Sequence, residues 1–408
     1  MPKLSDKLKS LGVKVGVEQI ATPLPKSKEN LFTILGGSLV DTPFGQVFIV
    51  DSHNPSEHLQ TQYSLHISMQ LNGISAWIKI PEIARLSINS IAFIDTETTG
   101  LSGGTGTFAF LIGLGRFENE NFTLKQLFLR EPLEEPGLLY LLEQLLAPCQ
   151  AVVTFNGKSF DLPILNSRYI LHGWQSPFPD LYHIDLLHLA RQLWRDRLSS
   201  RTLSSLEIQI LNTVRTQEDV PGWMIPQLYF DYLRSGDAMP LKKVFYHNAM
   251  DVLSLASLLD HTAKVMTDPF TYKPDHGEDI IALAKLYEKI GDIETASNLY
   301  LQGLQTTLPQ PLYLNTLHRF AYLNKRARKL DAAIELWKTA AEHNFLDAII
   351  ELAKYYEHKM QNYGEAIHWT KSAIKVINSS SLLPDKLDPV RMQLEHRLNR
   401  LLRKNRGE

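Results

Sequence analysis

The stretch that decides the fold is IAFIDTETTG, residues 91–100. Its first four residues are apolar, which indicates a buried strand, and Asp95 and Glu97 follow two positions apart. Side chains two positions apart on a strand point to the same face. Two carboxylates on one face repel each other and need cations or protons nearby, and divalent ions with oxygen ligands are the obvious candidates. A solvated strand end with two unrelated acids explains this stretch equally well.

The surrounding sequence predicts a mixed sheet with helices against it. Strand patterns cover residues 88–94, 108–114 and 121–130. A helical leucine spacing at 137–147 precedes a fourth apolar strand at 151–155, and helical patterns continue to about residue 265. Strands followed by a helix, a strand and further helices are typical of an α/β domain. We place this domain at residues 87–265, after an irregular β-containing N-terminal region at 1–86.

A third acid, Asp161, follows the fourth strand in TFNGKSFDLP, residues 154–163. The GKS triplet resembles the end of a phosphate-binding P-loop, but that loop needs a glycine five residues before its Gly-Lys pair. Val152 occupies this position, inside the apolar run of the strand, so the sequence argues against a P-loop. Asp161 either favours the positive end of a helix dipole or lies beside the first strand as a third ligand.

The remaining candidates lie in VFYHNAMDVLSLASLL, residues 244–259, which has the apolar stripe of a helix. Asp251 interrupts this stripe near its buried side. His247 lies four residues earlier on the same helical face, whereas Tyr246 lies five residues earlier and about 100° away around the helix. A histidine alone is more often solvated or capping, but the shared face with a carboxylate favours a catalytic role.

The last third of the chain is helical almost throughout and weakly repetitive. The segments that resemble one another are residues 282–300, 320–337 and 352–369. Their aligned alanines, Ala296, Ala333 and Ala366, are 37 and 33 residues apart, which fits helix-turn-helix repeats of the tetratricopeptide kind. A plain α-helical domain is the alternative. We predict tetratricopeptide-like repeats at 276–378, which offer a surface to a protein partner, and a basic helical tail at 379–408.

The composition predicts an ordinary globular protein without a membrane partner. Hydrophobic residues make up 44% and charged residues 21% of the chain. No apolar run approaches the ~20 residues of a membrane helix. The start, MPKLSDKLKSLGVKV, lacks the apolar core of a signal peptide and suggests a short amphipathic helix around Leu4, Leu8 and Leu11. The single cysteine, Cys149, favours a reducing compartment, so we expect a cytoplasmic protein.

Taken together, the motifs resemble a known group of enzymes. Asp95-x-Glu97, Asp161 and Asp251, with a nearby histidine, are similar to the three motifs of the DEDD exonuclease superfamily, and DTETTGL is typical of its DnaQ-like branch. The stretches GLSGGTGTFAFLIGLG, FNGKSFDLP and IPQLYFDYLRSGDAMPLKKVFYHNAMDVLSL look more closely like YprB-type proteins. Such proteins combine a ribonuclease H-like domain, a mixed sheet with flanking helices, with an all-α tetratricopeptide-like repeat domain.

This resemblance implies a metal-dependent nuclease, most simply a 3′→5′ exonuclease on single-stranded DNA or RNA. Two Mg²⁺ or Mn²⁺ ions would be held by Asp95, Glu97, Asp161 and Asp251. His247 would accept the proton of the attacking water. Because the net charge is −2, nucleic acid must be bound through a local patch or through the metal ions.

Two aspects of this assignment stay open. Members of the superfamily place a histidine five residues, or a tyrosine four residues, before the last aspartate, whereas this chain has Tyr246 at five and His247 at four. The alternatives to an exonuclease are a structure-selective endonuclease and a non-catalytic nucleic-acid-binding scaffold that acts through the repeats.

Asp185, just before a predicted helix, is interpreted as an N-cap or supporting residue and not as a ligand.

Overall fold

A computed structural model gives the fold of two compact units. It describes residues 28–53, 70–100, 106–118, 121–216, 218–379 and 384–407. The first unit comprises the chain up to Ser75, Ile80–His188 and Thr202–Ala263; the second comprises Ala76–Lys79, Leu189–Arg201 and the chain from Lys264 onward. The helix predicted around Leu4 and most of the glycine-rich stretch at 103–107 lie outside the described residues.

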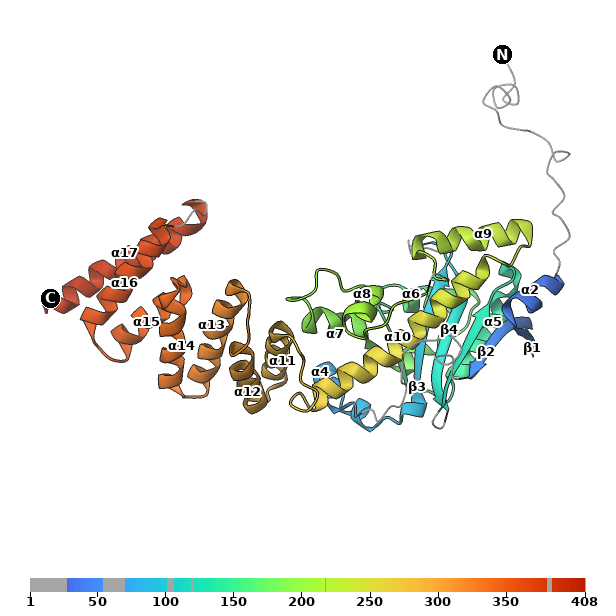
Figure 1. Cartoon of the computed structure of the whole chain (residues 1–408), viewed down its shortest axis with the longest axis horizontal. Helices are drawn as coiled ribbons and strands as arrows, with labels where there is room; N and C mark the ends of the chain where they lie inside the picture. Colours follow the sequence, from blue (N-terminus) through green and yellow to red (C-terminus); the bar gives the residue numbers. More distant parts are fainter. Residues whose placement is uncertain are drawn as a thin grey trace, which may run out of the picture. The chain divides into compact units, whose positions relative to one another are not determined.

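A seven-stranded mixed sheet forms the centre of the first unit (Figure 1). In spatial order its strands are β1 (Ser38–Thr42), β2 (Gly45–His53), β5 (Asn121–Phe128), β4 (Ala109–Glu118), β3 (Ile91–Thr98), β6 (Ala151–Thr154) and β7 (Tyr182–Asp185). The strands from β1 to β3 pair antiparallel, whereas β6 runs parallel to both β3 and β7. The mixed sheet predicted from the sequence is confirmed.

Two features of this sheet differ from the sequence expectation. Strands β1 and β2, which come from the N-terminal region, belong to the same sheet, because β2 pairs with β5 from Phe48 to His53. In addition, β7 interrupts the stretch that we predicted to be helical up to residue 265, so that prediction is wrong at this point. The strand has only four residues, YHID, and its two polar side chains hide the apolar pattern of a strand. Parallel pairing with β6 fixes its conformation instead.

Helices cover both faces of the sheet. Helix α5 (Glu135–Leu146) lies against Val47 of β2 at Gly137, and α6 (Asp161–Leu171) packs on α5. Helix α10 (Leu241–Thr267) contacts the opposite face, where Gln126 of β5 donates a hydrogen bond to the carbonyl of Phe245 at 2.8 Å. The other helices of this part of the chain are α2 (Lys28–Leu35), α4 (Asn72–Ile78), α7 (Leu186–Leu193), α8 (Leu203–Gln209) and α9 (Ile225–Ser235).

The second unit continues as three consecutive helix pairs. Their helices are α11 (Gly277–Ile290), α12 (Ile293–Leu304), α13 (Gln310–Arg326), α14 (Leu330–Glu342), α15 (Leu346–His358) and α16 (Tyr363–Ser379). The aligned alanines Ala296, Ala333 and Ala366 are all fully buried, as close helix packing requires. The all-helical architecture is thus confirmed, and the tetratricopeptide assignment stays a prediction. In the part of the chain that the structure describes, no helix is long and apolar enough to span a membrane.

The basic tail forms helix α17 (Pro384–Arg406), which packs on α16 and forms ion pairs with a buried acid of α15. The side chain of Glu357 on α15 is fully buried and accepts hydrogen bonds from Arg397 and Arg400 at 2.7 Å each. A buried carboxylate with two charged donors is a strong local constraint. Arg397 and Arg400 of the tail are therefore neutralised by an acid of the same chain.

Two glycines of β4 allow α10 to approach the sheet closely. A Cβ atom at Gly113 would lie 2.4 Å from Oδ1 of Asn248. A Cβ atom at Gly115 would lie 2.5 Å from Cγ1 of Val252 and 2.4 Å from Cζ of Phe122. Real side chains do not come so close, so any larger residue here forces the helix or its neighbours to move.

Gly115→Ala should therefore destabilise the protein by about 1–3 kcal/mol, the usual cost of overpacking a core. Urea denaturation followed by circular dichroism measures this change. Gly106→Ala is the matched control, because no atom lies within 4 Å of the added methyl group. Equal stability of the two variants would show that α10 does not rest on β4 as described.

Candidate active site

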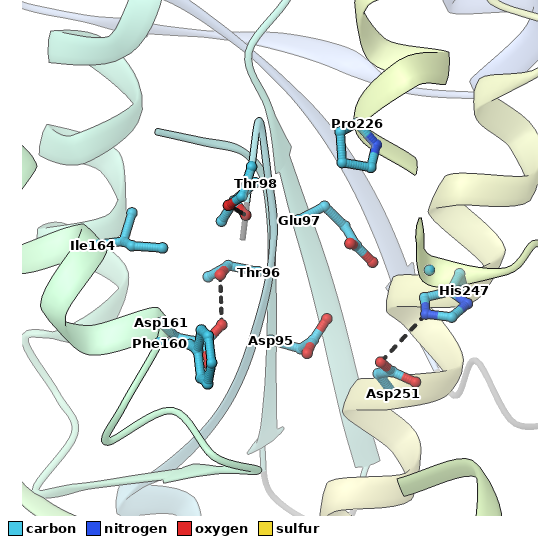
Figure 2. A pocket seen from close by; sticks show the side chains of 12 residues that line it. Asp95, Thr96, Glu97, Thr98, Phe160, Asp161, Ile164, Pro226, His247 and Asp251 are labelled. Atoms are coloured by element: carbon cyan, nitrogen blue, oxygen red, sulfur yellow. Dashed lines mark hydrogen bonds and ion pairs between the residues drawn. The ribbon is translucent and has the colours of Figure 1, made fainter. Parts of the chain in front are cut away.

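The end of β3 opens into a pocket of about 260 Å³ in the first unit. The five residues that the sequence singled out, Asp95, Glu97, Asp161, His247 and Asp251, all line it. They come from β3, from the first turn of α6 and from the N-terminal half of α10. Figure 2 shows Asp95 and Glu97 on the side of β3 that faces His247 and Asp251, while Thr96 points toward Asp161.

The position of Asp95 is fixed by the contact between β3 and α10. Asp95 is paired across the sheet with Gly113, the residue that leaves room for Asn248. The side-chain amide of Asn248 donates to the Asp95 carbonyl at 3.2 Å and to its Oδ2 at 2.8 Å. The amide oxygen of Asn248 in turn accepts a bond from Gln126 at 2.9 Å. Asn248 was not identified from the sequence, because an asparagine inside a helix carries no pattern of its own.

Asp161 reaches the same pocket from the other side of β3. It is the first residue of α6 and only 9% exposed. The hydroxyl of Thr96 donates to its Oδ1 at 2.5 Å. Thr96 points to the opposite face of β3 from Asp95 and Glu97, because side chains alternate along a strand. One face of β3 therefore meets Asp161 of α6, and the other faces Asp251 of α10 (Figure 2).

The loop before α6 is held by Asp185 at the end of β7. Its carboxylate accepts hydrogen bonds from the backbone N–H groups of Asn156 at 2.8 Å and Lys158 at 3.1 Å. It also accepts from the N–H of Leu187 at 3.1 Å, which confirms the interpretation of Asp185 as a helix cap. These two loop donors are thus unavailable to a phosphate. This agrees with the sequence argument against a P-loop.

His247 and Tyr246 have different surroundings. Nε2 of His247 lies 3.6 Å from Oδ2 of Asp251, and its Nδ1 lies 2.7 Å from Oδ1 of Asp219. The Tyr246 hydroxyl instead accepts a hydrogen bond from the backbone N–H of Thr216 at 3.0 Å. Tyr246 is buried and is not among the residues that line the pocket. The helix register therefore turns the histidine, and not the tyrosine, toward the carboxylates.

Sequence reasoning missed a buried arginine beside this group. Arg215 donates from Nη2 to Asp251 and from Nε to Oε2 of Glu207 at 2.8 Å. The side chain of Glu207 is 1% exposed and also accepts a hydrogen bond from Ser254 at 2.6 Å. Arg215 precedes His247 by 32 residues, a separation that matches no motif, so no signal in the sequence indicated it.

The carboxylates titrate abnormally because they are crowded and partly buried. Desolvation, together with the charges of Asp251, Glu97 and Asp161, raises the pKa of Asp95 well above its usual value. Desolvation raises the pKa of Glu97 to about 8, with Asp251 and Asp161 adding to the effect and His247 opposing it. Desolvation also raises the pKa of Asp161 to about 6, against the hydrogen bond from Thr96.

His247 responds to the same charges in the opposite sense. Desolvation lowers its pKa, but the hydrogen bond to Asp219 and the charges of Asp251 and Glu97 outweigh this and raise it to about 9. The protein without bound cations thus places a protonated histidine beside acids that hold on to their protons. Such reciprocal shifts are typical of functional sites.

The donor set fits a hard divalent cation. Four carboxylates supply only oxygen ligands, which Mg²⁺ and Mn²⁺ prefer. Burial and neighbouring negative charge raise the pKa values of Asp95, Glu97 and Asp161, and a bound cation would stabilise their ionised forms. Within the ranges that the structure describes, no group of three or more His, Cys, Asp or Glu side chains could hold an ion as it stands. One reason is that Arg215 already donates a hydrogen bond to an oxygen of Asp251. Binding an ion therefore requires these side chains to move together.

Comparison with known proteins assigns the class. A family model described as RNase_H superfamily matches residues 92–263, the part of the chain that carries strands β3 to β7 of the sheet and the pocket. The chain also matches "Uncharacterized protein YprB" of Bacillus subtilis (strain 168) with 34% identity over 297 residues. That match covers 70% of this chain and 69% of the relative. The chain therefore belongs to the ribonuclease H superfamily and, within it, to the YprB-type proteins.

Among solved structures, the family B DNA polymerase of Pyrobaculum calidifontis matches 49% of this chain and 29% of its own length. The sequence identity is 14% and the TM-score is 0.31, so this likeness carries no argument. Superfamily membership and the residues of the pocket together support nuclease chemistry.

The pKa shifts predict that the protein without divalent cations loses stability between pH 6 and pH 9. A folded-state pKa of about 8 for Glu97, against an ordinary 4.5, means that the folded state binds more protons between these values, so stability falls as pH rises. His247 acts in the same direction between 6.5 and about 9. Urea denaturation in EDTA across this range measures the slope.

Glu97→Gln should reduce this slope, because the amide does not titrate. Asp180→Asn, a change at an exposed position of the same unit, should leave it unchanged. A steep slope that persists in Glu97→Gln would contradict the assignment of the titration to this group.

Proposed function

We propose that this protein is a metal-dependent nuclease that removes nucleotides from the 3′ end of single-stranded DNA or RNA in the cytoplasm. The observation that carries the proposal is the convergence of Asp95, Glu97, Asp161 and Asp251 on one pocket. These four acids would together hold two divalent ions, either Mg²⁺ or Mn²⁺. When bound, such ions supply charge stabilisation at the phosphodiester and lower the pKa of the attacking water.

His247 is the proposed proton acceptor. Nδ1 of His247 lies 2.7 Å from Oδ1 of Asp219, which accepts, and 3.2 Å from Nη1 of Arg215, which only donates. The proposal places the proton on Nδ1, in the shorter contact, so that Nε2 is the free base on the pocket side. In the protein without cations its pKa is raised to about 9, mainly by neighbouring acids that oppose desolvation, so it is protonated at neutral pH. Cations held by Asp251 and Glu97 would cancel two of these charges and bring the histidine back toward its basic form.

The shape of the pocket supports a single-stranded substrate. Its volume is small, and Phe160 and Pro226 line it beside the acids. Phe160 is 43% exposed, which offers an aromatic face to an unpaired base. The helix pairs of the second unit are proposed as the surface for a protein partner.

Asp95→Asn and Asp251→Asn should each reduce cleavage by at least about 10²-fold, because each loses a charged ligand oxygen at the centre of the site. The assay uses end-labelled single- and double-stranded DNA and RNA with Mg²⁺, Mn²⁺ or EDTA. Asp231→Asn, which makes the same change at a partly exposed position outside the pocket, should leave the rate unchanged.

The products distinguish the alternatives. A ladder of single-nucleotide steps that starts at the 3′ end supports the proposal. Internal fragments from structured substrates would favour an endonuclease. If the protein degrades none of these substrates with either metal, the proposal fails and the scaffold alternative is favoured.

His247→Ala should slow cleavage by about 10²–10⁴-fold, the usual contribution of a positioned general base. Tyr246→Phe should have a much smaller effect, because it removes only the hydroxyl that binds the Thr216 backbone outside the pocket. Single-turnover rates at saturating metal compare the two variants. If Tyr246→Phe is the impaired variant and His247→Ala is nearly normal, the two roles must be exchanged.

A further inference from the structure

Arg215 places a positive charge directly against an acid of the proposed metal site. We propose that Arg215 is a positioning residue that acts as an internal cation: it holds Asp251 while no metal is bound and competes with the metal for that carboxylate. This inference rests on the proposed function. The proposed site then consists of four acids and one cationic side chain of the protein, Arg215.

The guanidinium group is anchored independently of Asp251. Its Nε and Nη2 atoms donate to the two carboxylate oxygens of Glu207 at 2.8 and 2.5 Å. Two parallel bonds of this kind fix both the position and the plane of an arginine. Glu207 is itself buried and held by Ser254 at 2.6 Å. Arg215 therefore stays in place when Asp251 turns away from it.

Asp251 is held between two cationic groups. Arg215 donates to its Oδ1, and Nε2 of His247 lies 3.6 Å from its Oδ2. Nη1 of Arg215 also lies 3.5 Å from Oδ2 of Asp219, the acid that holds His247. One buried charge thus contacts both the last acid of the site and the partner of its histidine. Neutral donors, in contrast, hold two of the other three acids: the amide of Asn248 donates to Asp95, and the hydroxyl of Thr96 donates to Asp161.

The charge of Arg215 sets the sign of its effect on metal binding. A dication at Asp251 either displaces the guanidinium from that carboxylate or shares the carboxylate with it. Both cases place like charges close together in a partly buried site, where screening by water is weak. Arg215 should consequently weaken metal binding while it stabilises the protein without metal. An arginine that only oriented Asp251 for the metal would have the opposite effect.

Titration of the full chain with Mn²⁺ in a calorimeter tests this sign. Arg215→Gln should bind Mn²⁺ about tenfold more tightly or better, since a nearby positive charge is removed. It should also have a lower melting temperature in EDTA. Arg215→Lys should bind nearly as the parent does, because the charge is retained. Arg168→Gln removes a comparable buried ion pair, with Glu135, and serves as the control for general damage.

A second variant covers the case in which Arg215→Gln does not fold because Glu207 is left without its partner. Glu207→Gln combined with Arg215→Gln removes both charges together and should still bind Mn²⁺ more tightly than the parent. Equal or weaker binding in the variants without Arg215, while the parent binds, overturns the inference alone. A parent protein that binds no Mn²⁺ overturns the proposed metal site and the inference with it.

Discussion

Repulsion among four carboxylates at the end of one strand is the constraint on which the rest of this structure depends. Burial strengthens the repulsion, and desolvation together with the neighbouring acids raises the pKa values of Asp95 and Glu97. The fold opposes it with a separate donor for each of three acids, from Asn248, Thr96 and Arg215. The site is therefore assembled by several segments that must all be in place, and not by a single motif.

Helix α10 contributes more to this assembly than any other element. Within five residues it supplies His247, Asn248 and Asp251, two of which face the pocket while Asn248 grips β3. This grip needs a short distance between helix and sheet, which Gly113 and Gly115 permit by having no side chain. Backbone packing in the core and charge placement in the pocket are thus two results of the same contact.

The sequence predicted the features that depend on local periodicity. Alternation placed Asp95 and Glu97 on one face of β3, and helical spacing placed His247 beside Asp251. Features that depend on pairing between distant segments could not be predicted from the sequence. The four residues of β7, for example, form a strand only because β6 lies beside them. The roles of Arg215 and Asn248 could not be predicted for the same reason. Their partners, Asp251 and Asp95, lie 36 and 153 residues away in the chain.

The buried Glu207 limits how this sequence can change through evolution. Its carboxylate takes hydrogen bonds from both Arg215 and Ser254, so a change at any one of the three positions leaves a buried polar group unsatisfied. Each such step costs about 1–3 kcal/mol, a large part of the stability of a domain. Drift at these positions is therefore coupled, and relatives should carry the whole trio or replace it as a unit. An alignment would show this as covariation among positions that belong to no catalytic motif.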